Sequence, residues 1–241
     1  MPAEPSEPFH EGPEGWAFDP AQFDGVARLF PLPGVSLFPR VVLPLHIFEE
    51  RYRELMQDAL DGDRLIAMAV LKPGWEQDYA SRPPLEPHAC LGRIVAHHQL
   101  DDGRFNLMLA GVARVKILSE IEPPRAFRRA RVELVEELEP SAGDPRIAEL
   151  QSKLSKAFRQ ALPAGEPPEP LQKAFHRDTP LGLLADLAGF TLPLATEVKQ
   201  QVLAEADVLT RAQLLIRAIE QSPPITPEGP SPGTPPPFSM N

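Results

Sequence analysis

The sequence predicts an α+β fold in which a β-rich, barrel-like unit precedes a small helical bundle. Up to about residue 139, most apolar residues form short runs separated by turn residues, as in the strands of a compact sheet. From Asp144 onward, apolar residues recur every three or four positions, which is the period of an amphipathic helix. We therefore expect two ordered units of different secondary structure.

Proline-rich stretches flank these units. Many of the 31 prolines lie at the two ends, where few apolar side chains are available to offset the entropy lost on ordering. We expect a disordered, acidic, proline-rich start over residues 1–25 and a disordered, proline-rich tail over 222–241. The β-rich unit is expected over 26–140 and the bundle over 141–221.

Seven apolar runs predict strands, and one helix interrupts them. Leu65–Leu71 is apolar at every position, which predicts a central strand. Asp101-Asp102-Gly103 supplies a hairpin turn, because glycine readily adopts positive φ. The helix is predicted over residues 48–60, before Asp61-Gly62. The predicted strands are 27–32, 41–45, 65–71, 90–100, 105–110, 112–118 and 127–134.

The helical segments of the bundle begin at about residue 147. The first ends at Pro163, and a shorter one is expected over 170–175. Thr179 is expected to cap the next helix through its hydroxyl, with Pro180 at the first helical position and Gly189 at the end. The last two are predicted over 196–205 and from Asp207 to about Gln221.

Composition disfavours several classes of protein. The chain has 24 Lys and Arg against 34 Asp and Glu, a net charge of −10, which disfavours binding to nucleic acid or to anionic membranes. Residues 1–24 contain no Lys or Arg and no apolar run, so no signal peptide is expected, and no membrane helix is predicted. Cys90 is the only cysteine, which favours a reducing compartment, and we expect the cytoplasm.

Two groups of residues suggest chemistry but fit it poorly. His88, Cys90, His97 and His98 lie close in sequence, yet their spacing matches no strong zinc pattern. Ser152 and Lys156 are one helical turn apart, but on the polar face, where lysine stays protonated and cannot activate a serine. We therefore expect no metal, no cofactor and no catalytic residue.

A cluster of arginines leaves RNA binding open as an alternative. Its members, Arg125, Arg128, Arg129 and Arg131, precede four glutamates at 133, 136, 137 and 139 that we expect to pair with them. The cluster also lacks the interleaved aromatic residues on which bases stack. An ion-paired strand end is the favoured interpretation.

The long loop Lys72–Pro87 is a further candidate for binding. It contains Trp75 and Tyr79, and aromatic side chains often anchor interfaces. The loop either contacts a ligand or folds back over one end of the barrel-like unit, and the sequence leaves both interpretations open.

Several short motifs, in order, resemble the N-terminal, substrate-binding domain of Lon proteases, and especially the short bacterial proteins that consist of that domain alone. The resemblance covers about residues 27–221, with the helical part from Thr179 to Glu220 included. It implies a six-stranded pseudo-barrel of the PUA-like kind followed by a helical bundle. The motifs are Leu29-Phe30-Pro31-Leu32-Pro33, Leu37-Phe38-Pro39, Leu43-Pro44-Leu45-His46-Ile47-Phe48-Glu49, Leu91-Gly92-Arg93-Ile94 and Leu109-Ala110-Gly111-Val112-Ala113-Arg114-Val115.

The sequence departs from full Lon proteases, which continue into ATPase and protease modules. No lysine here follows a glycine, so the phosphate-binding loop that ends in Gly-Lys-Ser/Thr is missing, and nothing matches the family's serine motif. The protease activity is therefore not carried over.

The remaining expectation is a non-catalytic module that binds unfolded or tagged protein clients. An adaptor or holdase in protein quality control is the expected role, with a protease or chaperone as a further partner and self-association in addition. The alternative is an RNA-binding PUA-like protein. The candidate substrate-binding residues are Phe38, Pro39, His46, Phe48, Trp75 and Tyr79.

Overall fold

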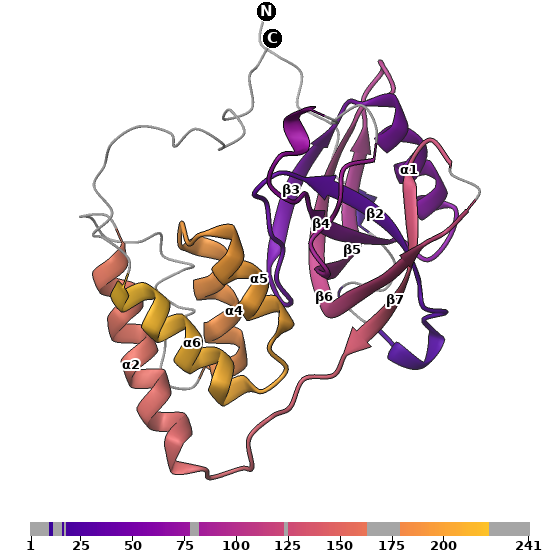
Figure 1. Cartoon of the computed structure of the whole chain (residues 1–241). Coiled ribbons are helices and arrows are strands. Elements are labelled where there is room, and N and C mark those ends of the chain that lie inside the picture. The colour runs from indigo at the N-terminus through magenta and orange to yellow at the C-terminus, as the bar shows by residue number, and fades with distance from the viewer. Residues whose placement is uncertain are drawn as a thin grey trace, which may run out of the picture. The chain divides into compact units, whose positions relative to one another are not determined.

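The computed structural model describes residues 10–11, 16, 18–77, 82–122, 125–162 and 179–221. They fall into two compact units (Figure 1). The first, here the sheet unit, comprises Met1–Phe30, Leu37–Ala69 and Pro87–Val135. The second, here the helical unit, comprises Pro31–Ser36, Val70–Glu86 and Glu136–Asn241. No helix among the described residues is both long and apolar enough to cross a membrane.

The strands form one sheet whose pairings close into a ring. Its order is β1-β5-β4-β2-β7-β6-β3, and an additional pairing of β5 with β6 closes a ring of five strands. β3 lies outside the ring, on the first half of β6, and β1 lies on β5. The strands are β1 (His10–Glu11), β2 (Val26–Leu32), β3 (Val42–Ile47), β4 (Leu65–Val70), β5 (His88–Gln99), β6 (Phe105–Glu120) and β7 (Arg128–Val135).

β6 joins two runs that the sequence analysis separated at Gly111. Gly111 continues the strand and lies opposite Gly92 on β5. Its amide donates to the Val41 carbonyl and its carbonyl accepts from the Arg40 amide, both at 2.8 Å. A Cβ at Gly111 would lie 2.1 Å from the Phe38 carbonyl oxygen. This glycine therefore permits a close approach of two backbones and does not end a strand.

The core of the sheet unit is built around β4 and helix α1 (Glu50–Leu60). Every residue of β4 is buried, as expected for a central strand. α1 buries Tyr52, Leu55, Met56 and Ala59, which share one helical face. The Tyr52 ring meets the Phe30 ring of β2 edge-on, with 4.4 Å between centroids. Burial of this apolar face fixes the helix on the sheet.

The helical unit contains α2 (Pro145–Ala161), α4 (Leu181–Thr191), α5 (Thr196–Ala204) and α6 (Val208–Gln221). α6 packs against the other three helices, and α2 also packs against α4. The segment expected over 170–175 lies outside the described residues. Asp144 caps α2 through its carboxylate, and Asp207 precedes α6, where its carboxylate accepts from the Thr210 amide at 2.7 Å. The predicted position of Asp207 is thus confirmed.

Two predictions about α4 were wrong. The residue that caps it is Pro180, and no side chain closes the cap. Thr179 instead offers its backbone carbonyl to the Gln151 side chain, 2.8 Å away on α2. Gly189 does not end the helix but is buried within it, and α4 continues until Leu192, which is itself buried.

The division between the units also differs from the expected one. The sheet unit ends at Val135 and not at residue 140, because Leu138 belongs to the helical unit. The Leu138 amide donates to the Ala206 carbonyl at 3.0 Å, and its carbonyl accepts from the Val208 amide at 3.2 Å. The described pair His10–Glu11 forms β1 within the start that was expected to be disordered, and residues 222–241 lie outside the description.

Candidate functional site

Among the described residues of the sheet unit, Phe48 is the most exposed large aromatic side chain. It follows the last residue of β3, precedes α1 and keeps 61% of its surface exposed. The His46 ring stacks beside it, with 6.1 Å between centroids and 26° between planes. We call Phe48, His46, Asn106 and Arg104 the Phe48 patch. An exposed ring held by a stacked neighbour is suited to apolar contact with a partner.

Strand pairing fixes the His46 ring. His46 on β3 lies opposite Asn106 on β6, and its Nδ1 is 2.7 Å from the Asn106 Oδ1. Its Nε2 is 3.4 Å from a guanidinium nitrogen of Arg104, which also binds Asp102 at 2.7 Å. Arg104 can only donate, so Nε2 accepts and Nδ1 donates. The ring therefore has one orientation, and it supports Phe48 in a fixed place.

The other predicted contact residues have different surroundings. Phe38 was named as a candidate for substrate binding, but its side chain is completely buried. Pro39 is buried as well. The backbone from Phe38 to Val41 is bound to Gly111, which holds this segment against the sheet. Trp75 is half-buried in a short 3₁₀ turn, Trp75–Gln77, of the helical unit, and Tyr79 lies outside the described residues.

Among the residues considered for metal binding, His98 of β5 lies opposite Asn106 of the Phe48 patch. Cys90 is buried in β5, and burial, followed by the charge of Lys116, lowers the pKa of His88. Within the ranges that the structure describes, no three His, Cys, Asp or Glu side chains gather as metal ligands would. Ser152 and Lys156 are both exposed on α2.

The arginine cluster does form ion pairs, but with other partners than expected. Arg125 binds Asp58 of α1, and Arg128 binds Glu120 of β6. Of the glutamates expected to pair with the cluster, Glu137 binds Arg211 of α6. Carboxylates of α1 and β6 thus compensate Arg125 and Arg128.

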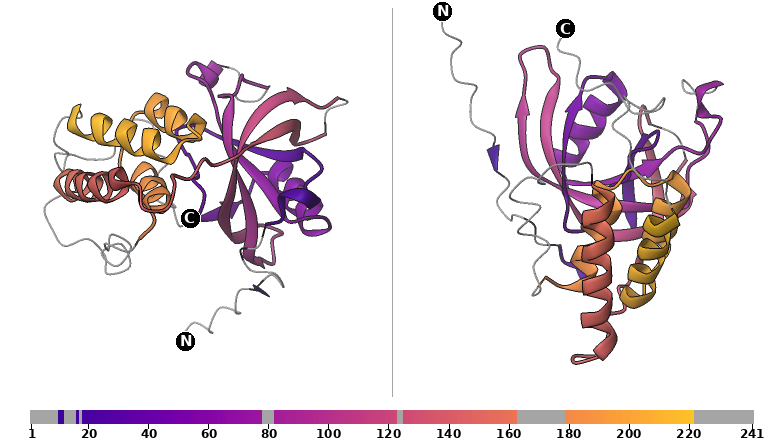
Figure 2. Two further views of the ribbon diagram at one scale, coloured as in Figure 1. Left: turned by 90° about the horizontal axis from the view of Figure 1, so that it is seen from below. Right: turned by 90° about the vertical axis from the view of Figure 1, so that its left-hand side faces the viewer.

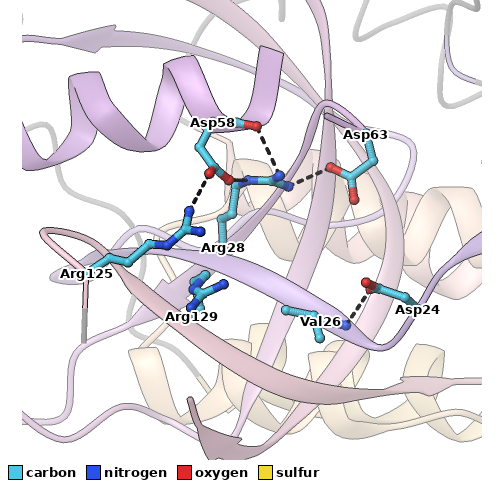
Figure 3. Close-up of a pocket in the computed structure, with 7 residues that line it drawn as sticks. All are labelled: Asp24, Val26, Arg28, Asp58, Asp63, Arg125 and Arg129. Carbon is cyan, nitrogen blue, oxygen red and sulfur yellow. Dashed lines mark hydrogen bonds and ion pairs between the residues drawn. The ribbon is translucent and has the colours of Figure 1, made fainter. Parts of the chain in front are cut away.

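Arg125 also borders a polar cavity of about 250 Å³ on the sheet unit (Figure 3). Arg28 of β2 crosses it, bound to Asp58 at 2.5 Å and to Asp63 at 2.6 Å. Its guanidinium also donates to the Asp58 carbonyl at 3.0 Å. The lining residues are Asp24, Val26, Arg28, Asp58, Asp63, Arg125 and Arg129.

Three carboxylates balance three guanidinium groups in this cavity, so it offers little net charge to a ligand. Burial alone would raise the pKa of Asp58, but hydrogen bonds and charges from Arg28, and then from Arg125, outweigh it and hold that pKa below its ordinary value. The arrangement ties α1 to β2, and its lining contains no Ser, Thr, Cys, Lys or His. Its evident role is structural.

Sequence reasoning missed Arg28, Asp58 and Asn106. Arg28 alternates with buried Ala27 and Leu29, so it had to lie on the outer face of its strand. A carboxylate-rich helix end, from Asp58 to Asp63, was the signal for its partner. Asn106 would have followed from the register of the β3–β6 pairing, which places it opposite His46.

Residues 26–221 match the profile of the ATP-dependent protease La (LON) substrate-binding domain. This chain belongs to that family. It is 27% identical over 193 residues to a Lon protease of Desulfosudis oleivorans, covering 79% of this chain and 23% of that protein. It is 28% identical over 189 residues to a Lon protease of Heliobacterium modesticaldum, covering 78% and 23%. The chain thus spans about a quarter of the length of these relatives.

Solved structures of Lon N-terminal domains share the fold. The N-terminal domain of the Mycobacterium avium complex Lon protease aligns with a TM-score of 0.60 at 20% identity, covering 81% of this chain and 98% of that one. A Lon N-terminal domain protein from Xanthomonas campestris aligns with a TM-score of 0.55 at 20% identity, covering 80% and 97%. The α+β prediction and the predicted family are confirmed.

Proposed function

We propose that this chain is a non-catalytic module that binds unfolded or tagged protein clients, acting as an adaptor or holdase. The observation that carries the proposal is the match of residues 26–221 to a substrate-binding domain. A protease or chaperone that receives the client, and self-association, belong to the same proposal. The single cysteine, which is buried, favours the cytoplasm as its location.

We further assign the sheet unit to the PUA-like pseudo-barrels and the helical unit to a small bundle. The closed pairing of β5, β4, β2, β7 and β6 supports the first assignment. The packing of α6 against α2, α4 and α5 supports the second. The ion pairs of Arg125 and Arg128 argue against the alternative of RNA binding. Both guanidinium groups already bind carboxylates, which would compete with RNA phosphates.

We place one client contact at the Phe48 patch and a second at Trp75. Phe48 exposes a large apolar surface, and His46 keeps that surface in place without needing to reorient on binding. Apolar burial acts on any unfolded segment that carries large side chains, so it suits a module that must accept many sequences. Phe38 and Pro39 are buried, so their contribution to client binding is to stabilise the fold that presents the contact residues.

The test is binding of reduced, carboxymethylated α-lactalbumin, a permanently unfolded protein, measured by fluorescence anisotropy. Burying a phenylalanine is worth about 1.5–3 kcal/mol, so Phe48→Ala should weaken binding about tenfold or more. Leu118→Ala is the matched control, because Leu118 is also exposed, at 56%, but lies in the second half of β6. Equal affinities for both variants and the parent chain would remove the Phe48 patch from the proposal.

A further inference from the structure

One edge of strand β5 continues beyond the end of β4. β5 pairs with β6 from His88 to Gln99, so one of its edges is fully occupied. β4 covers the other edge only from Cys90 to Arg93, and the Ile94 amide adds a bond to the Arg64 carbonyl at 2.9 Å. From Ala96 to Gln99, that second edge extends past β4.

The only described segment that pairs there is β1. His10 lies opposite His97 and Glu11 lies opposite Ala96, in antiparallel register. The short indigo strand of β1 lies near the β5–β6 hairpin in the right-hand view of Figure 2. A two-residue strand makes few ladder hydrogen bonds, so this occupation is easily exchanged.

The backbone amide and carbonyl groups of this edge are suited to pairing with an added strand. Unpaired amide and carbonyl groups on a sheet edge are a template for strand addition, and proteins usually block such edges with lysine or proline. The four residues Ala96, His97, His98 and Gln99 contain neither.

We propose that the β5 edge from Ala96 to Gln99 is a second client-binding site, which takes an extended client segment as an added β-strand. His10–Glu11 occupies it in the free chain and yields to the client. This inference rests on the proposed function and deepens it. Main-chain hydrogen bonds supply affinity without demanding a particular sequence, which suits unfolded clients.

The inference predicts competition between the two strands. A tethered segment acts at an effective concentration in the millimolar range, so β1 lowers the apparent affinity for an external strand. Fixing β1 on the edge should therefore block client binding at this site, and removing its ability to pair should improve it.

A disulfide between His10→Cys and His97→Cys tests the blocked state. Directly opposed residues bring their Cβ atoms within about 4.5–5.5 Å, close to what a disulfide needs. We expect the oxidised protein to bind carboxymethylated α-lactalbumin at least about fivefold more weakly than the same sample after reduction. The single variant His97→Cys, oxidised in the same way, controls for the oxidant, and Cys90 is buried.

Two variants of β1 test the state in which β1 has left the edge, without any change in β5. His10→Pro/Glu11→Pro removes both amide donors of β1, so it should raise affinity for the same probe severalfold. His10→Ala/Glu11→Ala keeps the amides and should change affinity little. A result in which the proline and alanine pairs bind alike would overturn the proposal.

The remaining outcomes are equally decisive. If the disulfide fails to form, the segment does not lie on this edge and the inference is wrong. If the bond forms but oxidised and reduced proteins bind alike, while Phe48→Ala still weakens binding, only the edge site is excluded. If the parent chain does not bind the probe at all, the proposed function fails first and this inference fails with it.

Discussion

The sheet unit has no room for a side chain at Gly111. A Cβ there would meet the Phe38 carbonyl oxygen at 2.1 Å, and a backbone atom cannot rotate away. At Gly92, directly opposite, the nearest atom to a Cβ would be the side-chain Cγ of Leu109, 2.6 Å away. Leu109 can adopt another rotamer, whereas the segment Phe38–Val41 is bound to Gly111 on both sides.

We therefore predict that Gly111→Ala destabilises the chain more than Gly92→Ala does. Overpacking at a site that relaxes costs about 1–3 kcal/mol, which is the expectation for Gly92→Ala, and Gly111→Ala should exceed that range. Urea unfolding followed by circular dichroism gives both values. Equal losses of unfolding free energy for the two variants would contradict the close approach at Gly111.

Asp58 makes the stability of the sheet unit depend on pH. Its pKa in the folded chain lies below the ordinary value of 3.8, since Arg28 and Arg125 outweigh the effect of burial. A carboxyl with a lowered folded pKa stabilises the fold at pH above its unfolded value, and this stabilisation is lost as the pH falls through the folded pKa.

Asp58→Asn should thus lower the unfolding free energy at about pH 7, and the difference from the parent chain should vanish below the folded pKa, which lies under 3.8. Thermal unfolding at a series of pH values measures it. Asp101→Asn, at the exposed hairpin tip, is the control and should change little at any pH. A difference that stays constant down to the lowest pH would show that Asp58 acts through packing.

Single residues also mark where sequence reasoning reaches its limit. Periodicity placed Arg28 and Phe105 on their strands, but it could not show which distant carboxylate meets which arginine. Arg125 and its partner Asp58 are 67 positions apart. Phe38 was suggested for substrate binding, and only the crossing of its backbone over Gly111 explains its burial.

Among the elements, β6 organises the sheet unit. Its first half pairs with β3, its second half pairs with β7, and β5 pairs with it from Phe105 to Lys116. The sequence predicted all of these strands within a few residues, because each contains an apolar run. It could not predict that two runs form one strand, since a glycine within a strand and a glycine at a turn look alike locally.

Helix α6 depends on the completely buried Arg211. Its guanidinium binds Glu137, lies 3.9 Å from Asp186 of α4 and donates to the Glu205 carbonyl at 3.1 Å. One side chain therefore joins α6 to α4 and to the segment before α2. Removing it would leave the buried carboxylate of Asp186 without this cation.

We predict that Arg211→Met destabilises the helical unit by about 3–5 kcal/mol, because breaking a buried ion pair leaves uncompensated charge. Adding Asp186→Asn to that variant should restore part of the loss, since it removes one of the carboxylates that lost its partner. Guanidinium-induced unfolding of both variants measures the difference. If the double variant is less stable than Arg211→Met, the acidic side chain stabilises the unit in some other way.

At the scale of the whole molecule, the order of short motifs along the chain predicted the family. The candidate binding surface could be identified only from the structure. Each motif is short, but their order along residues 27–221 is specific, and the family match covers nearly the same range. Side-chain exposure is not encoded in such motifs. Of the six residues suggested for binding, Phe38 and Pro39 are buried and Phe48 is prominently exposed.

The net charge of −10 bears on how the molecule holds a client. A cationic groove would make binding depend steeply on salt, because neutralised phosphates or carboxylates release counterions. Apolar contact at Phe48 and strand addition at β5 involve no net charge. Salt at about 1 M shortens the screening length to about 3 Å but leaves apolar burial in place.

We therefore predict that binding of carboxymethylated α-lactalbumin persists between about 0.1 M and about 1 M salt, changing less than about threefold, and that a single-stranded RNA of similar length is not retained at the lower concentration. Anisotropy with both labelled probes, on the parent chain and on Phe48→Ala, gives the comparison. If the affinity for the client is lost at high salt and is unchanged in Phe48→Ala, charged groups provide most of the interaction. The outward-facing arginines of β7, Arg129 and Arg131, would then be the residues to substitute, because Arg125 and Arg128 are held by Asp58 and Glu120.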